Sequence, residues 1–274
     1  MLALTKEYIT DLYYLVDELL PKGLPKNNLG GRPLSLIPAE VVTLLLWNTL
    51  TVRSKTLKDA HAWAQMYHAD DFPTLPKYKA FVHLCHQAGP NMLHVLQSLL
   101  ASNSPLVFVD STMLQVCKLV RADSHKVAAN IADFGKNHQG WHYGFKLHAS
   151  INPKNQLCGF ALTPASIYDA QKLPNLINHN TRVAVGDSHY GASVMRAAVW
   201  KKFGTLVVAP PHFKQKKKLI TWWQHKLLTM RPKIESVFDY LKEHLHLVTS
   251  FPRSVSGYLI HYLRILLAYQ IMHF

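Results

Sequence analysis

Three carboxylates in the second half of the chain have the placement that metal-assisted chemistry needs. Asp110 ends the apolar run FVD, Asp187 ends the run AVGD, and Glu235 lies in the basic segment RPKIES. A carboxylate on a buried strand is unfavourable unless a positive charge pairs with it. Mg²⁺ prefers oxygen ligands, with one or two carboxylates per ion and water or phosphate oxygens in the remaining positions. The trio therefore predicts a site for divalent cations, with Asp110 as the bridging ligand.

A site of this composition is suited to chemistry on a phosphodiester. Two metal ions about 3.5–4 Å apart activate the attacking oxygen and stabilise the leaving one. Each aspartate taken alone also has a structural interpretation: Asp110 would cap a turn with Ser111, and Asp187 would cap the helix that follows it. The occurrence of both aspartates at strand ends, together with a glutamate in a basic helix, favours the metal site.

Basic residues surround the glutamate at helical spacing. Arg231 precedes Glu235 by four residues and Lys242 lies two turns beyond it, so that the three share one helix face. The ordinary interpretation is a salt-bridged surface. The functional interpretation is that Arg231, Lys233 and Lys242 hold DNA phosphates beside the metal ions.

Two further basic residues are candidates for DNA contact. Lys146 lies two residues before His148 in an alternating segment, so both side chains point to the same face of a strand expected beside Asp110. Arg32 lies in a Pro/Gly/Asn-rich connector over residues 21–33. Packing or exposure to solvent is the alternative for Lys146.

The charge of the chain favours a polyanionic partner. The 274 residues include 30 Lys+Arg and 16 Asp+Glu, a formal net charge of +14. Residues 1–100 have nine basic and eight acidic side chains, whereas residues 101–274 have twenty-one and eight. Nucleic acid is the first candidate for so basic a domain, ahead of an anionic membrane surface or a role in solubility alone. Three scattered cysteines and the lack of a signal peptide or long apolar span indicate a soluble cytoplasmic protein.

Two regions differ in their periodicity. Residues 1–103 read as entirely helical, with short connections that suit either a DNA-binding module or a structural cap. Residues 104–274 predict an α/β domain. Its strands are expected at 106–110, 143–151, 157–162, 182–187 and 205–209, and its helices at 169–177, 193–203, 222–246 and 255–274. This order gives a mixed five-stranded sheet flanked by helices.

Several stretches together resemble bacterial insertion-sequence transposases of the DDE type. The matching stretches are FVDST (108–112), GWHYGFKLH (140–148), LTPAS with the following Asp169 (162–169), VGDSHYG (185–191) and the spaced residues Arg231, Glu235 and Lys242. The segments at 31–36 and 75–81 are also similar, so the resemblance covers nearly the whole chain.

The resemblance implies a ribonuclease-H-like catalytic core and an N-terminal helical region that binds DNA ends. Asp110, Asp187 and Glu235 would be the metal-binding triad, with Mg²⁺ or Mn²⁺ as the cofactor. Such enzymes cut the terminal inverted repeats of their element and join the free 3′-hydroxyl to target DNA, usually as homodimers on paired ends. A ribonuclease-H-like nuclease without strand transfer and a non-catalytic DNA-binding repressor remain the alternatives.

The sequence departs from the family pattern in two places. Leu228 stands where a tyrosine often precedes the arginine, and Ser188–His189 replaces a basic residue after the second aspartate. The interval from Asp187 to Glu235 is too short for a large inserted domain, so an aromatic residue that handles a flipped base would have to come from elsewhere, with Trp222 or Trp223 as candidates.

Overall fold

The computed structural model describes residues 6–21, 34–51, 56–137, 140–211 and 219–274, and the chain divides into two compact units. Met1–Leu99 and Phe251–Met272 form the first unit, and Leu100–Ser250 with His273–Phe274 form the second. Arg32 lies outside the described residues. The C-terminal helix was expected in the second region but groups with the N-terminal helices, so the observed division differs from the simple boundary at residue 103.

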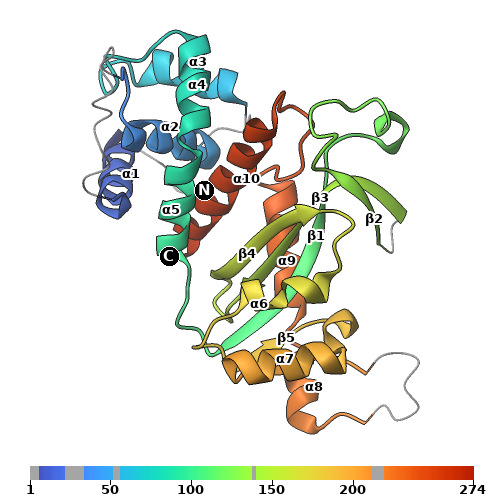
Figure 1. Ribbon diagram of the computed structural model, residues 1–274. Coiled ribbons are helices and arrows are strands. Elements are labelled where there is room, and N and C mark those ends of the chain that lie inside the picture. The colour runs from blue at the N-terminus through green and yellow to red at the C-terminus, as the bar shows by residue number, and fades with distance from the viewer. Residues whose placement is uncertain (1–5, 22–33, 52–55, 138–139, 212–218) are drawn as a thin grey trace. The chain divides into compact units, whose positions relative to one another are not determined.

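All regular secondary structure in the described part of the first unit is helical (Figure 1). Its helices are α1 (Lys6–Leu19), α2 (Pro38–Thr51), α3 (Leu57–Tyr67), α4 (Tyr78–Gln87), α5 (Gly89–Leu99) and α10 (Val255–His273). Helix α10 is buried almost all round, and its Gln270 donates to the Leu99 carbonyl at 2.7 Å. Burial on every side explains why this helix has an apolar sequence and joins the α-helical unit. Within the described residues, no helix combines the length and apolarity that a membrane span requires.

The second unit is built on a mixed sheet of six strands. The strands are β1 (Leu106–Gln115), β2 (Asp133–Asn137), β3 (Gly140–Ile151), β4 (Leu157–Pro164), β5 (Val183–Val185) and β6 (Leu206–Val208). The order is β2-β3-β1-β5-β6, and β4 also pairs with β3. β1 is antiparallel to β3 but parallel to β5, which in turn is parallel to β6.

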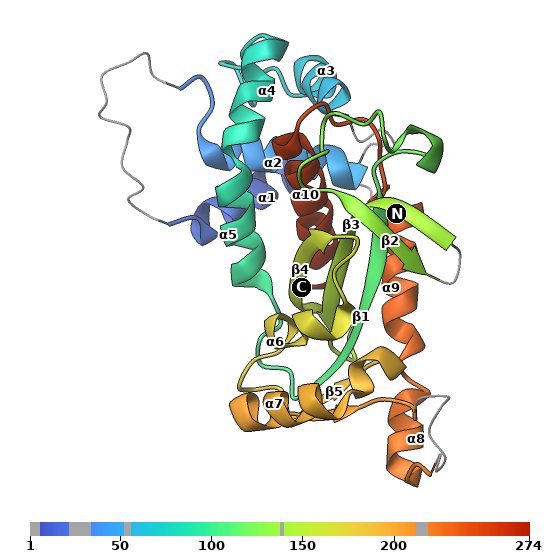
Figure 2. The same ribbon diagram turned by 45° about the vertical axis from the view of Figure 1, so that its right-hand side comes forward.

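Helices flank both faces of this sheet (Figures 1 and 2). The first face packs against α6 (Leu173–Leu176) and α7 (Ser193–Phe203) through a core that includes Val107 and Val109. The other face packs against α9 (Pro232–Glu243), which follows the short helix α8 (Trp222–Leu228). Alternate residues of a strand point to opposite faces, so Asp110 faces the α9 side and Ser111 faces the side of α6.

The parallel register of β1 and β5 brings two of the acids together. Phe108 pairs with Val185, and extending this register by two residues places Asp187 level with Asp110. Among the described strands, β5 accompanies β1 only as far as Phe108. Asp110 therefore lies on a part of β1 that has no β5 partner among the described residues.

The structure corrects several details of the predicted elements. The sheet has six strands rather than five, because the polar, mostly exposed segment DFGKN of β2 has no apolar run to reveal it. β1 continues to Gln115, so Asp110 lies within the strand and not at its end. The expected helix over 169–177 is a 3₁₀ turn, Asp169–Lys172, followed by α6. The expected helix over 222–246 is divided before Pro232, which begins α9.

A glycine in β3 is required by the close approach of β1. Gly144 has φ +153°, and a Cβ atom there would lie 2.2 Å from the Leu114 carbonyl oxygen. We expect Gly144→Ala to lower the free energy of unfolding by about 3 kcal/mol or more, since an unfavourable backbone conformation alone costs about 1–3 kcal/mol. Urea denaturation followed by circular dichroism measures this loss.

Gly204 provides the matched control, because it also has a positive φ (+68°) but no atom within 4 Å of the added Cβ. Gly204→Ala should cost only about 1 kcal/mol, the strain of the left-handed conformation. Equal losses for the two variants would show that the contact with Leu114 does not matter.

Candidate active site

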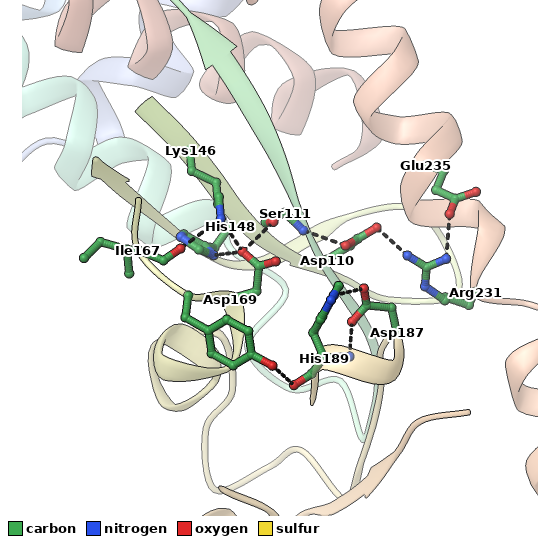
Figure 3. A network of polar contacts seen from close by, with 11 residues as sticks. Asp110, Ser111, Lys146, His148, Ile167, Asp169, Asp187, His189, Arg231 and Glu235 are labelled. Atoms are coloured by element: carbon green, nitrogen blue, oxygen red, sulfur yellow. Dashed lines mark hydrogen bonds and ion pairs between the residues drawn. The ribbon is translucent and has the colours of Figure 1, made fainter. Parts of the chain in front are cut away.

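Asp110 is a carboxylate removed from water and held at both oxygens. Its Oδ1 accepts the backbone N–H of Ser111 at 2.8 Å, and its Oδ2 lies 2.6 Å from Nη2 of Arg231 (Figure 3). The side chain is only 14% exposed. The pKa of Asp110 is raised to about 6, mainly by burial and to a smaller extent by Asp187 and Asp169, against the lowering effects of Arg231 and the Ser111 N–H. The site therefore has more negative charge than Arg231 balances.

Asp187 follows β5 and begins the 3₁₀ turn Ser188–Gly191. Its Oδ1 accepts the backbone N–H of His189 at 2.9 Å, and its Oδ2 lies 2.8 Å from Nδ1 of the same histidine. The capping role considered from the sequence is thus present. Because Asp187 also contributes to the raised pKa of Asp110, it both caps the turn and belongs to the acidic group.

Glu235 lies in the first turn of α9 and is half exposed. Its Oε1 lies 2.6 Å from Nη1 of Arg231. One guanidinium group therefore bridges Asp110 and Glu235, and Figure 3 shows it between the two carboxylates. The structure brings the three predicted acids to one region, but Arg231 stands between two of them.

The acids do not form a ready-made metal centre. No group of three or more His, Cys, Asp or Glu side chains within the described ranges is arranged to hold a metal ion. The donor types nevertheless fit a hard divalent cation, because all are carboxylate oxygens. The guanidinium between Asp110 and Glu235 shows that a positive charge is accommodated at this position.

Lys146 does not have the exposed position expected of a DNA contact. It is 8% exposed, and its ammonium group donates to the Ile167 carbonyl at 2.8 Å and to Oδ1 of Asp169 at 2.9 Å. The packing alternative therefore describes Lys146 better. The lysine and Asp169 form a largely buried ion pair beside the acids.

Asp169 is the residue of this site that the sequence analysis did not single out. Its Oδ1 also accepts the hydroxyl of Ser111 at 2.8 Å, and its charge raises the pKa of Asp110. The only sequence signal was its place at the end of the LTPAS segment of the family resemblance. Strand periodicity could not reveal it, since Asp169 lies in a 3₁₀ turn.

The remaining predicted basic residues have different surroundings. Lys233 donates to the Pro153 carbonyl at 2.9 Å. Lys242 is partly buried, and burial lowers its pKa against the opposing effects of Asp239, Glu243 and Asp110. Lys242 thus lies within electrostatic reach of the acids, whereas the ammonium group of Lys233 is directed to the turn between β3 and β4.

The structure also gives the positions of Leu228 and His189, which depart from the family pattern. Leu228 ends α8, and His189 interacts with Asp187 and is more than half exposed. Trp222 and Trp223 are 77% and 41% exposed, so neither is buried in the core.

A pocket of about 450 Å³ adjoins the turn that Asp187 begins. Its polar lining includes Tyr168, Ser188, His189, Arg196 and Gln224. The pocket therefore borders the turn that follows Asp187, while the three acids themselves do not line it.

Comparison with known proteins agrees with this geometry. The family model described as "Transposase DDE domain" matches residues 101–255, more than half of the chain. The structure is similar to that of a piggyBac transposase determined by cryo-electron microscopy in a synaptic complex with hairpin DNA, with a TM-score of 0.54 and 7% identity over 98% of this chain and 72% of that one. At this identity the likeness concerns the fold alone. A search of curated proteins gave no match. The matched family model shows that this chain belongs to the DDE transposases.

Proposed function

We propose that this transposase binds the ends of an insertion-sequence element, cleaves them and joins the 3′-hydroxyl to target DNA. Asp110, Asp187 and Glu235 are the proposed catalytic residues, on a sheet of the ribonuclease-H-like type. The observation that carries the proposal is the gathering of these acids beside the open edge of β1, within the segment that matches the family model.

The same three acids are the proposed ligands of Mg²⁺, with Mn²⁺ as a substitute. Bound divalent cations supply the positive charge that activates an attacking oxygen and stabilises a leaving one. The carboxylate of Asp110 supports this assignment, because burial raises its pKa and a bound cation would stabilise its charged form. A divalent cation held by Asp110 and Glu235 would compete with the guanidinium of Arg231 for these carboxylates.

A displaced Arg231 is well suited to bind DNA. Its guanidinium presents paired N–H donors that match a phosphate group. Lys242, Lys233 and Arg32 are the further proposed DNA contacts, Lys233 after release of its bond to Pro153. Lys146 is a proposed contact only if its ion pair with Asp169 opens. The excess of basic residues after position 100 supports double-stranded DNA as the partner.

The proposed organisation keeps the boundary at residue 103, although α10 groups with the helical unit. Residues 1–103 are the proposed DNA-end-binding region, and 104–274 are the proposed catalytic region, with α10 packed in the helical unit. Terminal inverted repeats and target DNA are the proposed substrates, handled by a homodimer on paired ends. The piggyBac complex with hairpin DNA supports DNA as the ligand of this fold.

Neutral replacement of each acid tests the proposed chemistry. We expect Asp110→Asn, Asp187→Asn and Glu235→Gln to reduce cleavage and strand transfer at least about 100-fold, since a metal ligand contributes no less than the groups that support it. A plasmid with two element ends, incubated with Mg²⁺ and target DNA, gives cleaved and joined products that are resolved by electrophoresis.

Glu243→Gln is the matched control, because Glu243 is an exposed glutamate on the same helix and should leave both products unchanged. Cleavage without joined product would identify a nuclease instead. DNA binding without any product from the native protein would identify a repressor. Full activity of Asp110→Asn would contradict the assigned triad.

Arg231→Gln tests the competition between the guanidinium and the metal ion. In metal-free buffer this variant should melt at a lower temperature than the native protein, because the buried Asp110 loses its cation. Mg²⁺ should then raise the melting temperature more than it does in the native protein, since no guanidinium competes. Differential scanning fluorimetry measures both changes.

Arg231→Gln should also bind end DNA more weakly. The slope of the logarithm of the binding constant against the logarithm of the salt concentration should decrease in magnitude by about one, as expected for one lost phosphate contact. Arg121→Gln, at an exposed arginine of the same unit, controls for the loss of positive charge in the thermal measurement. An identical Mg²⁺ response in native and Arg231→Gln proteins would contradict the competition.

A further inference from the structure

Tyr168 and Asp169, which are consecutive in the chain, are hydrogen-bonded to the residue after Asp110 and to the turn after Asp187. Figure 3 shows Asp169 near Ser111, Lys146 and His148. It connects β4 to the 3₁₀ turn that precedes α6. Neither residue belongs to the proposed triad. Their contacts indicate what they contribute to it.

Asp169 reaches Asp110 through one intervening residue. The hydroxyl of Ser111 donates to Oδ1 of Asp169 at 2.8 Å, while the backbone N–H of Ser111 donates to Oδ1 of Asp110 at 2.8 Å. At this point β1 has already passed its last pairing with β5, at Phe108. The Ser111 hydroxyl bond therefore fastens a part of β1 that lacks a strand partner on one side among the described residues.

Asp169 is itself fixed by two groups on β3. Lys146 binds its Oδ1 at 2.9 Å, and Nδ1 of His148 lies 3.7 Å from the same oxygen. Thr163 donates its hydroxyl to the Pro164 carbonyl, so it accepts the proton of Nε2 of His148. Burial lowers the pKa of His148 to about 4 and so disfavours its charged form. Lys146 is the closer positively charged partner of Asp169.

Tyr168 reaches Asp187 in a corresponding way. Its hydroxyl donates to the His189 carbonyl at 3.1 Å, and the rings of Tyr168 and His189 meet edge to face. The backbone N–H and Nδ1 of His189 in turn contact both carboxylate oxygens of Asp187. One dipeptide thus supports the residues that orient both aspartates.

We propose that Tyr168 and Asp169 are positioning residues that set the distance and orientation of the Asp110 and Asp187 carboxylates for binding divalent cations, through Ser111 and His189 respectively. The inference rests on the proposed function of these aspartates. Groups that hydrogen-bond to metal ligands typically contribute about 10- to 100-fold in metal affinity. The alternative is that the Lys146–Asp169 pair serves the stability of the domain alone.

Binding of Mn²⁺ to the full chain without DNA tests the proposal independently of activity. The paramagnetic resonance signal of free Mn²⁺ gives the dissociation constant, and thermal melting of each variant checks its fold. We expect Ser111→Ala and Tyr168→Phe each to weaken binding about 10-fold, since each removes a single hydroxyl that supports one ligand. Ser150→Ala is the matched control, because this buried β3 hydroxyl donates to the Leu176 carbonyl and has no bond to the acids.

Combined variants separate positioning from general stability. Ser111→Ala and Asp169→Asn both act on the position of Asp110. Their double variant should therefore bind Mn²⁺ with about the affinity of whichever single variant binds it more weakly. Ser111→Ala with Tyr168→Phe act on different aspartates, so their losses should multiply. If Asp169→Asn fails to fold, Asp169→Asn with Lys146→Met removes both charges of the pair and should still show the weakened binding.

Asp110→Asn distinguishes failure of this inference from failure of the proposed function. Native Mn²⁺ affinity in Asp110→Asn would overturn the triad itself. Loss of binding in Asp110→Asn, with native affinity in Ser111→Ala, Tyr168→Phe and the Asp169→Asn/Lys146→Met variant, would overturn only the positioning role. A uniform loss that follows the melting temperature and includes Ser150→Ala would assign the network to stability.

Discussion

The arrangement of the second unit depends on a carboxylate that folding has removed from water. Asp110 lies within β1, and its burial requires positive charge close by. Arg231 supplies that charge at the start of α9 and extends the same interaction to Glu235. The ion pair between Arg231 and Asp110 therefore joins the start of α9 to β1. The guanidinium of Arg231 also holds Glu235 near Asp110 in the absence of a metal ion.

The two faces of β1 have different tasks. Asp110 points toward Arg231 on the α9 side, whereas Ser111 points toward Asp169 on the other side. Consecutive residues thus connect a charged site on one face to a network of hydrogen bonds on the other. Val107 and Val109 pack in the core of that second face, so the strand that bears the acid is held by apolar contacts as well as by polar ones.

Most of the fold could be predicted from the pattern of residues within each segment. Contacts between different segments could not be predicted in this way. Apolar runs located β1, β4, β5 and β6, and an alternating segment located β3. The polar β2 has no such run, so the sixth strand was missed. For the site, strand placement selected Asp110 and Asp187. It could not show the bridge through Arg231 or the pairing of Lys146 with Asp169, because these contacts depend on which side chains meet across the sheet.

The three acids come from β1, the turn after β5 and the start of α9, and this order has a consequence for biosynthesis. During synthesis, Asp110 emerges from the ribosome long before Glu235. The parallel pairing of β1 with β5 also joins residues that are far apart in the sequence. Contacts of such long separation form slowly, because a large loop must close first. In the nascent chain, Asp110 therefore has no ion pair with Arg231 until the segment that forms α9 has emerged. Assembly of the acidic site is a late event in the folding of this polypeptide.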